Sequence, residues 1–421
     1  MSMQVVALAF AAGVVCRPRD IFVEQTVARL ARVVTVGSGA DGPVDDGTGQ
    51  LPATPIMCWL RGQQGPIEQF NQTVVLQAPE EVTEADVVVV LQALLDRHAM
   101  LRLRAEDDGA GGWSLQVPEA GTVDAGACLQ SVDVLSDEAV VAARSRLDPG
   151  AGVMLSALWV ASTGQLVVIA HHLAVDGVSW RILLEDLNIA WAQHRGGRQV
   201  TLPVTGTSFA RWASLLAEQA RRAEIVEQAQ AWRQVAATPA AVPSVRPDVD
   251  MFATAGHLSA SLDVETTRML LAEVPAAFHA GVHDILLIAF ALAWAQFLGR
   301  HGNSIGIDVE SHGRDEQLAS DVDLSHTVGW FTTKYPVALT VGELSWAQVV
   351  AGETALGAVV KDAKEQLRAA PDPVPTVCCG ISTPTSSWRG PSRQSGSTIW
   401  GASAPRQLTR PVMCGVSARR T

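Results

Sequence analysis

The sequence predicts an α/β fold, because patterns typical of strands and of helices alternate along the chain. Residues 166–170 are all apolar and rich in β-branched types, which is typical of a strand covered on both faces. From Val178 to Trp191 the apolar side chains recur at helical spacing, which indicates an amphipathic helix. Residues 304–310 alternate Ile and Val with Gly and carboxylates, which indicates a second strand with Asp308 and Glu310 on one face.

Composition is typical of a globular protein. The chain has 421 residues, of which 48% are hydrophobic and 18% charged, enough to bury a core in two or three domains. The net charge of −12 gives little support for nucleic-acid binding. Six cysteines without regular spacing form no disulfide framework, so we expect a reducing, cytoplasmic location. We expect no membrane segment, because the apolar stretch at residues 1–16 is too short to span a bilayer and reads as an amphipathic helix.

The N-terminal part is predicted to contain a small helical piece and a linker. Residues 1–34 suggest a helix, a loop, a short turn and a second helix from Val23. Residues 36–53 are rich in Gly, Asp and Pro and have no apolar period, which is typical of a linker. A new domain is expected to begin at about residue 54.

The remaining elements follow from periodicity. Residues 70–76 are predicted to be a strand and residues 85–98 a helix. Residues 208–235 favour one long helix, since they are rich in good helix formers. The proline-containing stretch 236–256 is predicted to link two lobes, and residues 283–298 to form an apolar core helix.

Two histidines follow the first strand directly. His171 and His172 end the apolar run, and Asp176 and Gly177 mark a turn before the helix. Titratable side chains at the end of a buried strand are typical of a site on a rigid scaffold. A histidine beside a buried strand is often only a hydrogen-bonded core residue. Metal binding has little support, because no further Cys, His or Glu stands nearby at ligand spacing.

The whole pattern HHxxxDG resembles the core motif of the condensation-domain superfamily of non-ribosomal peptide synthetases. ESHGRD at 310–315 and TVGWFTTKYPV at 327–337 resemble the EGHGRE and TVGWFTxxYPV motifs of epimerization domains. PIMCWL at 55–60 and the FNQ that begins at Phe70 resemble the opening motifs of these domains, with Met57 in place of the usual Gln. The HxxLRxR segment that begins at His98 is also similar, and its arginines, Arg102 and Arg104, are expected to be structural.

The resemblance implies epimerization at Cα of an aminoacyl or peptidyl thioester by two acid/base groups, His172 and Glu310. An imidazole with a pKa of about 6.5 can take or give a proton near neutral pH. Glu310, with an ordinary pKa of about 4.3, needs burial to act as an acid. Asp176 is expected to pair with an arginine, and Gly177 to permit the turn. The remaining supporting neighbours by motif are His171, Asn71, Ser179 and Trp330.

The resemblance also implies two chloramphenicol-acetyltransferase-like lobes, at 54–235 and 257–370, with the site at their junction and the second lobe incomplete. Residues 1–35 resemble the C-terminal part of a peptidyl carrier protein, and Ser2 stands too late to match its attachment serine. The substrate is expected on the 4′-phosphopantetheine arm of a carrier protein, with no cofactor or metal bound by this chain. The expected partners are that carrier and other synthetase modules.

Residues 371–421 differ from the rest of the chain. Six arginines and one acid give this tail a charge of +5, which leaves −17 for the preceding part. The GYG and FNYLG motifs of the family do not appear, so we interpret the tail as out of frame or disordered and expect an unstable or inactive chain. A basic functional tail and a zinc site at Cys378, Cys379 and Cys414 have little support, because the cysteines form no CxxC pair.

Three functions therefore remain open from sequence. The first is an epimerization domain of a peptide synthetase, indicated by ESHGRD and GWFTTKYPV. The second is a condensation domain or stand-alone acyltransferase, which shares HHxxxDG but forms an amide or ester. The third is a non-catalytic remnant that only docks a carrier protein.

Overall fold

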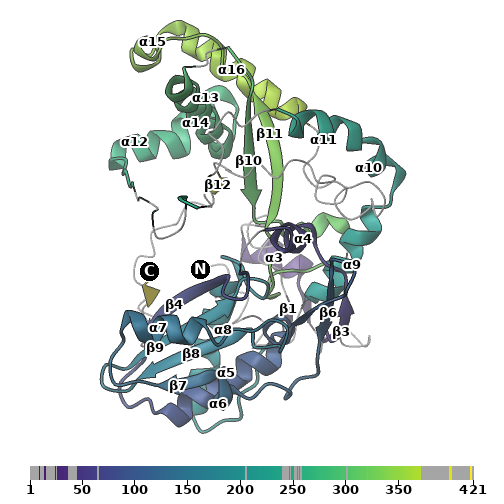
Figure 1. The fold of residues 1–421 in the computed structure, drawn as a ribbon, viewed down its shortest axis with the longest axis vertical. Coiled ribbons are helices and arrows are strands. Elements are labelled where there is room, and N and C mark those ends of the chain that lie inside the picture. Colours follow the sequence, from purple (N-terminus) through teal and green to yellow (C-terminus); the bar gives the residue numbers. More distant parts are fainter. Residues whose placement is uncertain are drawn as a thin grey trace.

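The computed structural model describes residues 45–63, 66–203, 206–238, 258–299, 302–319 and 321–370, with short pieces within 9–36 and 246–256 and strands at 398–400 and 418–419 (Figure 1). The chain forms an N-terminal lobe, drawn in the lower half of Figure 1, and a C-terminal lobe above it. Both lobes combine helices with sheet, which confirms the α/β prediction.

The N-terminal lobe is built on a sheet with strand order β13-β4-β9-β8-β7. Its strands are β4 (Asn71–Gln77), β7 (Leu129–Ser131), β8 (Leu155–Val160), β9 (Gln165–His171) and β13 (Ala418–Arg419). All neighbouring pairs are antiparallel except β7 and β8. In the pairing of β4 with β9, Asn71 lies opposite His171. This register brings the first residues of β4 to the end of β9, where the histidines lie.

Helices cover both faces of this sheet. The helices of this region are α5 (Glu84–Arg97), α6 (Ala125–Cys128), α7 (Asp137–Arg144) and α8 (Ser179–Arg195). Leu166 and Val168 of β9 belong to the main core together with α5 and α8. Val167 and Ile169 face the other way and pack with residues of α7. The apolar run therefore lies between two helical layers, as its composition predicts.

A second sheet, with strand order β3-β6-β5, completes this lobe. The elements around it are β3 (Gly49–Leu51), α4 (Pro55–Arg61), the 3-10 helix η1 (Ala99–Arg102), β5 (Arg104–Asp107) and β6 (Trp113–Val117). β3 lies inside the linker expected at 36–53, so the linker is shorter than predicted; the backbone of β3 pairs with β6. Arg102 is buried and donates hydrogen bonds to the carbonyls of Leu95, Asp96 and Pro118, a structural role.

The C-terminal lobe is organised around the antiparallel strands β10 (Ile305–Ser311) and β11 (Thr333–Leu339), which extend toward the N-terminal lobe in Figure 1. Its other elements are α12 (Val264–Arg268), the π-helix η3 (Met269–Glu273), α13 (Val274–Phe278), α14 (Val282–Leu298), the 3-10 helix η4 (Glu316–Leu318), α15 (Trp346–Val350), α16 (Thr354–Ala369) and β12 (Thr398–Trp400). Ile305, Ile307 and Val309 pack against α14, which confirms the predicted alternation.

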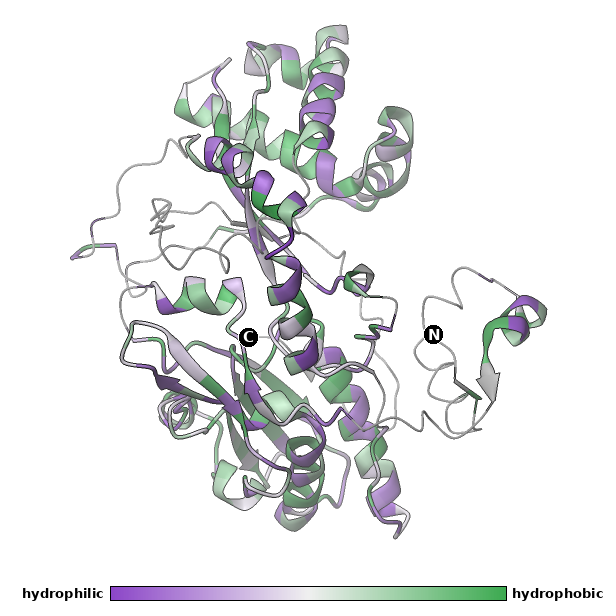
Figure 2. Ribbon diagram, turned by 90° about the vertical axis from the view of Figure 1, so that its right-hand side faces the viewer, coloured by the Kyte–Doolittle hydropathy of each residue, from purple (hydrophilic) through white to green (hydrophobic). Residues whose placement is uncertain are grey.

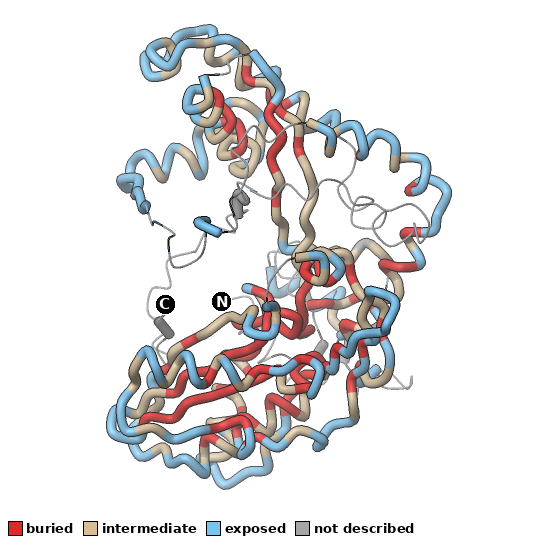
Figure 3. The backbone as a smooth tube through the Cα atoms, in the orientation of Figure 1, coloured by how far each residue is buried: buried red, intermediate tan, exposed pale blue. Residues whose placement is uncertain are grey.

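Burial differs between the two lobes. Figure 3 shows buried residues concentrated in the N-terminal lobe, whereas most helices of the C-terminal lobe are exposed along much of their length. Figure 2 shows hydrophilic and hydrophobic residues mixed along most helices, as expected where one face of a helix covers a core. Among the described residues no single helix is long and apolar enough to cross a membrane. The bent pair of Val264–Phe278 and Val282–Leu298 together has the length and the apolar composition of a span.

The long helix predicted at 208–235 is wrong. The chain forms three helices there: α9 (Phe209–Gln219), α10 (Ala223–Glu227) and α11 (Ala229–Ala236). α9 packs with β3 of the N-terminal lobe, whereas α11 packs against β11 of the C-terminal lobe. Because its two ends are held by different lobes, the segment bends, and the backbone of Arg222 is extended between α9 and α10. Tertiary contacts here outweigh helix propensity.

The N-terminal piece is described only in part. Val14–Val15 form the strand β1, which pairs with β2 (Thr35–Val36), where a helix was predicted. The backbone pairing with β2, which helix propensity does not predict, holds these residues in a strand. The second predicted helix is present as α3 (Val27–Val33), shorter than expected. The carrier-protein interpretation of 1–35, most of the 236–256 linker and most of the 371–421 tail lie outside the described residues.

Candidate active site

The first of the two histidines is held as a structural residue. The Nε2–H of His171 donates to the carbonyl of Ile67 over 2.9 Å, and its Nδ1 accepts the N–H of Leu173 over 3.1 Å. Burial lowers the pKa of His171 to about 4. A neutral ring with both nitrogens engaged has no free group for proton transfer near neutral pH. His171 therefore fixes the end of β9.

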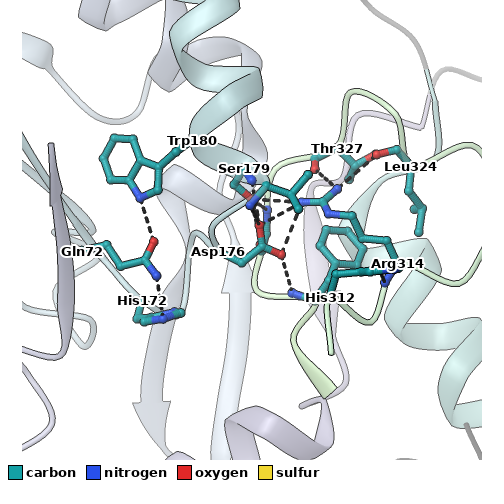
Figure 4. A network of polar contacts seen from close by, with 12 residues as sticks. Gln72, His172, Asp176, Ser179, Trp180, His312, Arg314, Leu324 and Thr327 are labelled. Atoms are coloured by element: carbon teal, nitrogen blue, oxygen red, sulfur yellow. Dashed lines mark hydrogen bonds and ion pairs between the residues drawn. The ribbon is translucent and has the colours of Figure 1, made fainter. Parts of the chain in front are cut away.

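The second histidine has different surroundings. Its ring stacks on Phe70 with a centroid distance of 4.9 Å and lies 4.6 Å from the ring of Trp330. Its Nε2 lies 2.9 Å from the amide nitrogen of Gln72, and Figure 4 shows the two side chains facing each other. Burial lowers the pKa of His172, against smaller raising effects of nearby backbone and of the Asp176 charge. A largely neutral, positioned imidazole is suited to act as a base.

Asp176 joins the turn after His172 to the C-terminal lobe. Its carboxylate accepts the N–H and hydroxyl of Ser179 and the N–H of Val178 at the start of α8. Across the lobes it accepts the N–H of Phe331 over 3.2 Å and pairs with Arg314 over 3.1 Å (Figure 4). The expected arginine partner is therefore Arg314 of the ESHGRD motif.

Arg314 lies in the loop after β10 and is largely buried. Its side chain is only 9% exposed. It also donates to the carbonyls of Leu324 and Thr327 and lies over the ring of Phe331, 4.1 Å from the ring centroid. The loop after β10 is thus tied both to Asp176 and to the segment that leads into β11.

That segment, residues 321–331, packs into the N-terminal lobe, although the sequence assigned it to the second lobe. Its apolar members that enter the main core are Val322, Leu324, Val328, Trp330 and Phe331. Thr207 accepts the N–H of Asp323 and donates its own N–H to the carbonyl of Asp323. This packing brings Trp330 to the ring of His172.

Glu310 lies near the end of β10, partly buried, on the face that it shares with Asp308. Burial raises the pKa of Glu310, although the charge of Lys334 on the paired strand lowers it. Lys334 lies 3.6 Å from Asp308 and 4.7 Å above the ring of Trp59 in α4. Within the described chain Glu310 makes no hydrogen bond to His172.

The raised pKa of Glu310 predicts a pH-dependent stability. A group whose pKa is raised by folding contributes stability that is present below its ordinary value of 4.5 and is lost as pH rises through the raised value. Glu310→Gln cannot ionise, so its free energy of unfolding should gain on that of the wild type over the pH range above 4.5 in which Glu310 ionises. Denaturant titrations across this range measure the difference.

The control for this experiment is Glu265→Gln, at an exposed glutamate whose pKa is lowered by hydrogen bonds from Arg268. There the stability appears as pH rises through the lowered value to 4.5, so the wild type should gain on this variant only at acidic pH, and the difference should stay constant where Glu310 ionises. A Glu310→Gln difference that is flat with pH would contradict the raised pKa.

Two sequence expectations about supporting residues need correction. The side chain of Asn71 donates to the carbonyl of Gln69 and accepts from Thr73, so it serves its own strand. Neighbouring strand positions face opposite sides, and Gln72 is the residue that contacts His172. Gly177 is not required by the turn, because its φ is not positive and an added Cβ meets no atom within 4 Å.

Gly177→Ala should therefore leave the free energy of unfolding unchanged or raise it by up to about 1 kcal/mol. Gly313→Ala is the contrasting variant, because Gly313 has a φ of +65° and an added Cβ would overlap the carbonyl oxygen of Phe331. Chemical denaturation of both variants tests the difference. Equal losses of stability would show that the turn at Gly177 does need glycine.

Sequence reasoning missed Gln72 and Trp180. Gln72 belongs to the FNQ stretch and Trp180 is the first strongly apolar residue of α8, but only the fold brings Gln72 to His172 and Trp180 to Gln72. Among the described residues no group of three or more His, Cys, Asp or Glu is arranged to hold a metal ion. The positioned imidazole of His172 and the partly buried carboxyl group of Glu310 are both groups able to transfer protons.

Comparisons with known proteins fit this arrangement. The family model described as "Condensation domain" matches residues 58–373. The chain is 34% identical over 390 residues to a chondramide synthase of Chondromyces crocatus, a match that covers 88% of this chain and 10% of that protein. A linear gramicidin synthase of Brevibacillus parabrevis is 33% identical over 390 residues, which cover 88% of this chain and 7% of the relative. The chain thus spans about a tenth or less of the length of these relatives.

Solved structures agree with the family match. The epimerization domain from the third module of tyrocidine synthetase B superposes with a TM-score of 0.65 at 26% identity, covering 81% of this chain and 76% of that one. The X-domain from teicoplanin biosynthesis has a TM-score of 0.57 at 21% identity, covering 83% of this chain and 76% of that one, which is a likeness of fold alone. The fold of two chloramphenicol-acetyltransferase-like lobes is confirmed.

Proposed function

The chain belongs to the condensation-domain family, and on this premise we propose that it epimerises the Cα of an aminoacyl or peptidyl thioester. The substrate would be carried on the 4′-phosphopantetheine arm of a carrier protein, in the cytoplasm, with other synthetase modules as partners. His172 and Glu310 would be the two acid/base groups. The similarity to the epimerization domain of tyrocidine synthetase B supports epimerization as the reaction.

One observation carries the proposal. Asp176 follows His172 by four residues, and Arg314 follows Glu310 by four residues. The buried pair of Asp176 with Arg314 therefore ties the loop behind the base to the loop behind the carboxyl group. Such a tie holds groups from two lobes in a fixed relation, as acid/base catalysis on two faces of one carbon requires.

The chemistry needs both groups in complementary states. Removal of the Cα proton by neutral His172 leaves the C–H electron pair in the thioester carbonyl as an enolate. A protonated Glu310 on the other face then returns a proton to Cα and re-forms the carbonyl. The lowered pKa of His172 and the raised pKa of Glu310, both caused mainly by burial, favour these two starting states.

The test is solvent exchange at Cα. The full chain is incubated in D₂O with a carrier protein that bears an L-aminoacyl thioester, and the released amino acid is analysed by chiral chromatography and mass spectrometry. Deuterium at Cα together with the D-isomer supports the proposal. A new amide or ester without deuterium at Cα would instead indicate a condensation domain. Carrier binding without either product would indicate a docking module.

A further inference from the structure

The side chain of Gln72 lies between Trp180 and His172. The indole N–H of Trp180 donates to Oε1 of Gln72 over 2.7 Å, and Nε2 of Gln72 lies 2.9 Å from Nε2 of His172. Figure 4 shows the three side chains in this order. Trp180 and His172 are both buried, with 6% and 8% of their surface exposed. Gln72 itself is half-buried, so the contact between the amide and the imidazole is partly shielded from water.

The direction of these hydrogen bonds follows from the donors. An indole nitrogen can only donate, so the Gln72 atom that faces Trp180 is the carbonyl oxygen. The amide NH₂ then faces His172, and this group can also only donate. Nε2 of His172 must accept this hydrogen bond with its lone pair. In the neutral ring the proton is accordingly on Nδ1.

The other side of the ring agrees with this assignment. Nδ1 of His172 is buried and makes no hydrogen bond of standard geometry among the described residues. No described residue holds Nδ1 as a hydrogen-bond acceptor, so nothing on this side of the ring opposes a proton on Nδ1.

We propose that Gln72, oriented by Trp180, is a positioning residue that fixes His172 in the Nδ1–H form and makes Nε2 its reactive atom. The inference rests on the proposed function for the step that Nε2 performs. That atom takes the Cα proton, and the C–H electron pair moves into the thioester carbonyl. Before substrate binds, the amide of Gln72 donates a hydrogen bond to the lone pair of Nε2. The substrate displaces this hydrogen bond before Nε2 takes the Cα proton, because a lone pair accepts one proton at a time.

The proposal makes Gln72→Glu an informative variant. Glutamate has nearly the shape of glutamine, but an ionised carboxylate accepts hydrogen bonds where the amide donates them. The proton of the neutral His172 ring should therefore move to Nε2, and the nearby charge should raise the pKa of the ring. Asp176 and His171, the other titratable groups that act on His172, are unchanged in this variant.

The experiment is ¹⁵N NMR of the histidine rings in the full chain, with the His172 signals assigned through His172→Gln. The wild type should show a protonated Nδ1 and an unprotonated Nε2, and Gln72→Glu should show a protonated Nε2. Trp180→Phe removes the indole donor, frees the amide to turn over, and should give a mixture of both forms. It also serves as the second variant if Gln72→Glu does not fold.

Gln77→Glu is the matched control, since Gln77 lies at the far end of the same strand and its amide donates to the carbonyl of Thr163. It should leave the His172 signals unchanged. A wild-type ring protonated on Nε2, or the same ring form in the wild type and Gln72→Glu, would overturn the proposal. The NMR result is independent of turnover, so a ring that switches in a chain without Cα exchange would refute only the proposed function.

In the exchange assay Gln72→Glu should lower kcat by about 10²–10⁴-fold, the usual contribution of a general base. KM should change little, because the substitution alters the state of the base and keeps the shape of the site. A rise in KM with an unchanged kcat would indicate a role in substrate binding and would contradict positioning of the base.

Discussion

Arg314→Ala is expected to lower the free energy of unfolding by about 3–5 kcal/mol, the usual loss when one partner of a buried ion pair is removed. Both side chains are shielded, with 9% of Arg314 and 5% of Asp176 exposed. The variant also leaves the carbonyls of Leu324 and Thr327 without their guanidinium donor. Chemical denaturation of the full chain, followed by tryptophan fluorescence, measures the loss.

The chain offers a matched control on the same segment. Arg211 pairs with Asp321 over 2.7 Å, but these side chains are 48% and 61% exposed. Arg211→Ala should therefore cost only about 0–1 kcal/mol, because solvent screens the pair. Equal losses in the two arginine variants would contradict a special role of the buried pair. A double-mutant cycle with Asp176→Asn isolates the interaction between Asp176 and Arg314.

Arg314→Ala should also disturb the surroundings of His172. Arg314 lies over Phe331, and the neighbouring Trp330 contacts the ring of His172. Release of the 321–331 segment from the N-terminal lobe would remove Trp330 from the ring of His172. The buried pair thus contributes to stability and to the position of the base through the same contacts.

Local pattern was sufficient for the elements that carry the site. The strand β9 and the helix α8 follow from a change of apolar period, and β10 follows from the alternation of Ile305, Ile307 and Val309. β9 and β10 bury the apolar residues that their patterns predict, and the apolar stripe of α8 faces the core with Leu184 and Trp191 half-buried. Periodicity alone therefore places the motif residues His172 and Asp176 just after the end of a buried strand.

Contacts between distant segments could not be predicted in this way. The 321–331 segment has apolar residues, but nothing in its sequence says that they enter the core of the other lobe. The register of β4 on β9 decides that Gln72 reaches His172 while Asn71 does not. The bend within 208–235 likewise arises because its ends pack on different lobes. These features depend on pairing and packing that local periodicity does not encode.

The largest effect on activity is expected from separate removal of the two acid/base groups. In a two-base reaction each enantiomer loses its Cα proton to a different group. His172→Ala should slow deuterium exchange from one enantiomer of the thioester by about 10²–10⁴-fold and leave exchange from the other much less affected. Glu310→Gln should do the reverse. Both variants should lose interconversion of the isomers, because each retains a base on only one face.

The comparison of enantiomers separates this mechanism from its alternatives. A single base that serves both faces would give a variant without exchange from either isomer and a second variant with exchange from both. Loss of exchange in both variants with both isomers would point instead to disruption of the site, which the His172 ring signals of Glu310→Gln would reveal. Opposite selectivity in two variants with intact folds requires one proton-transfer group on each face of Cα, and we propose the partly buried Glu310, whose loop is tied to the His172 loop through Arg314 and Asp176, as the group opposite His172.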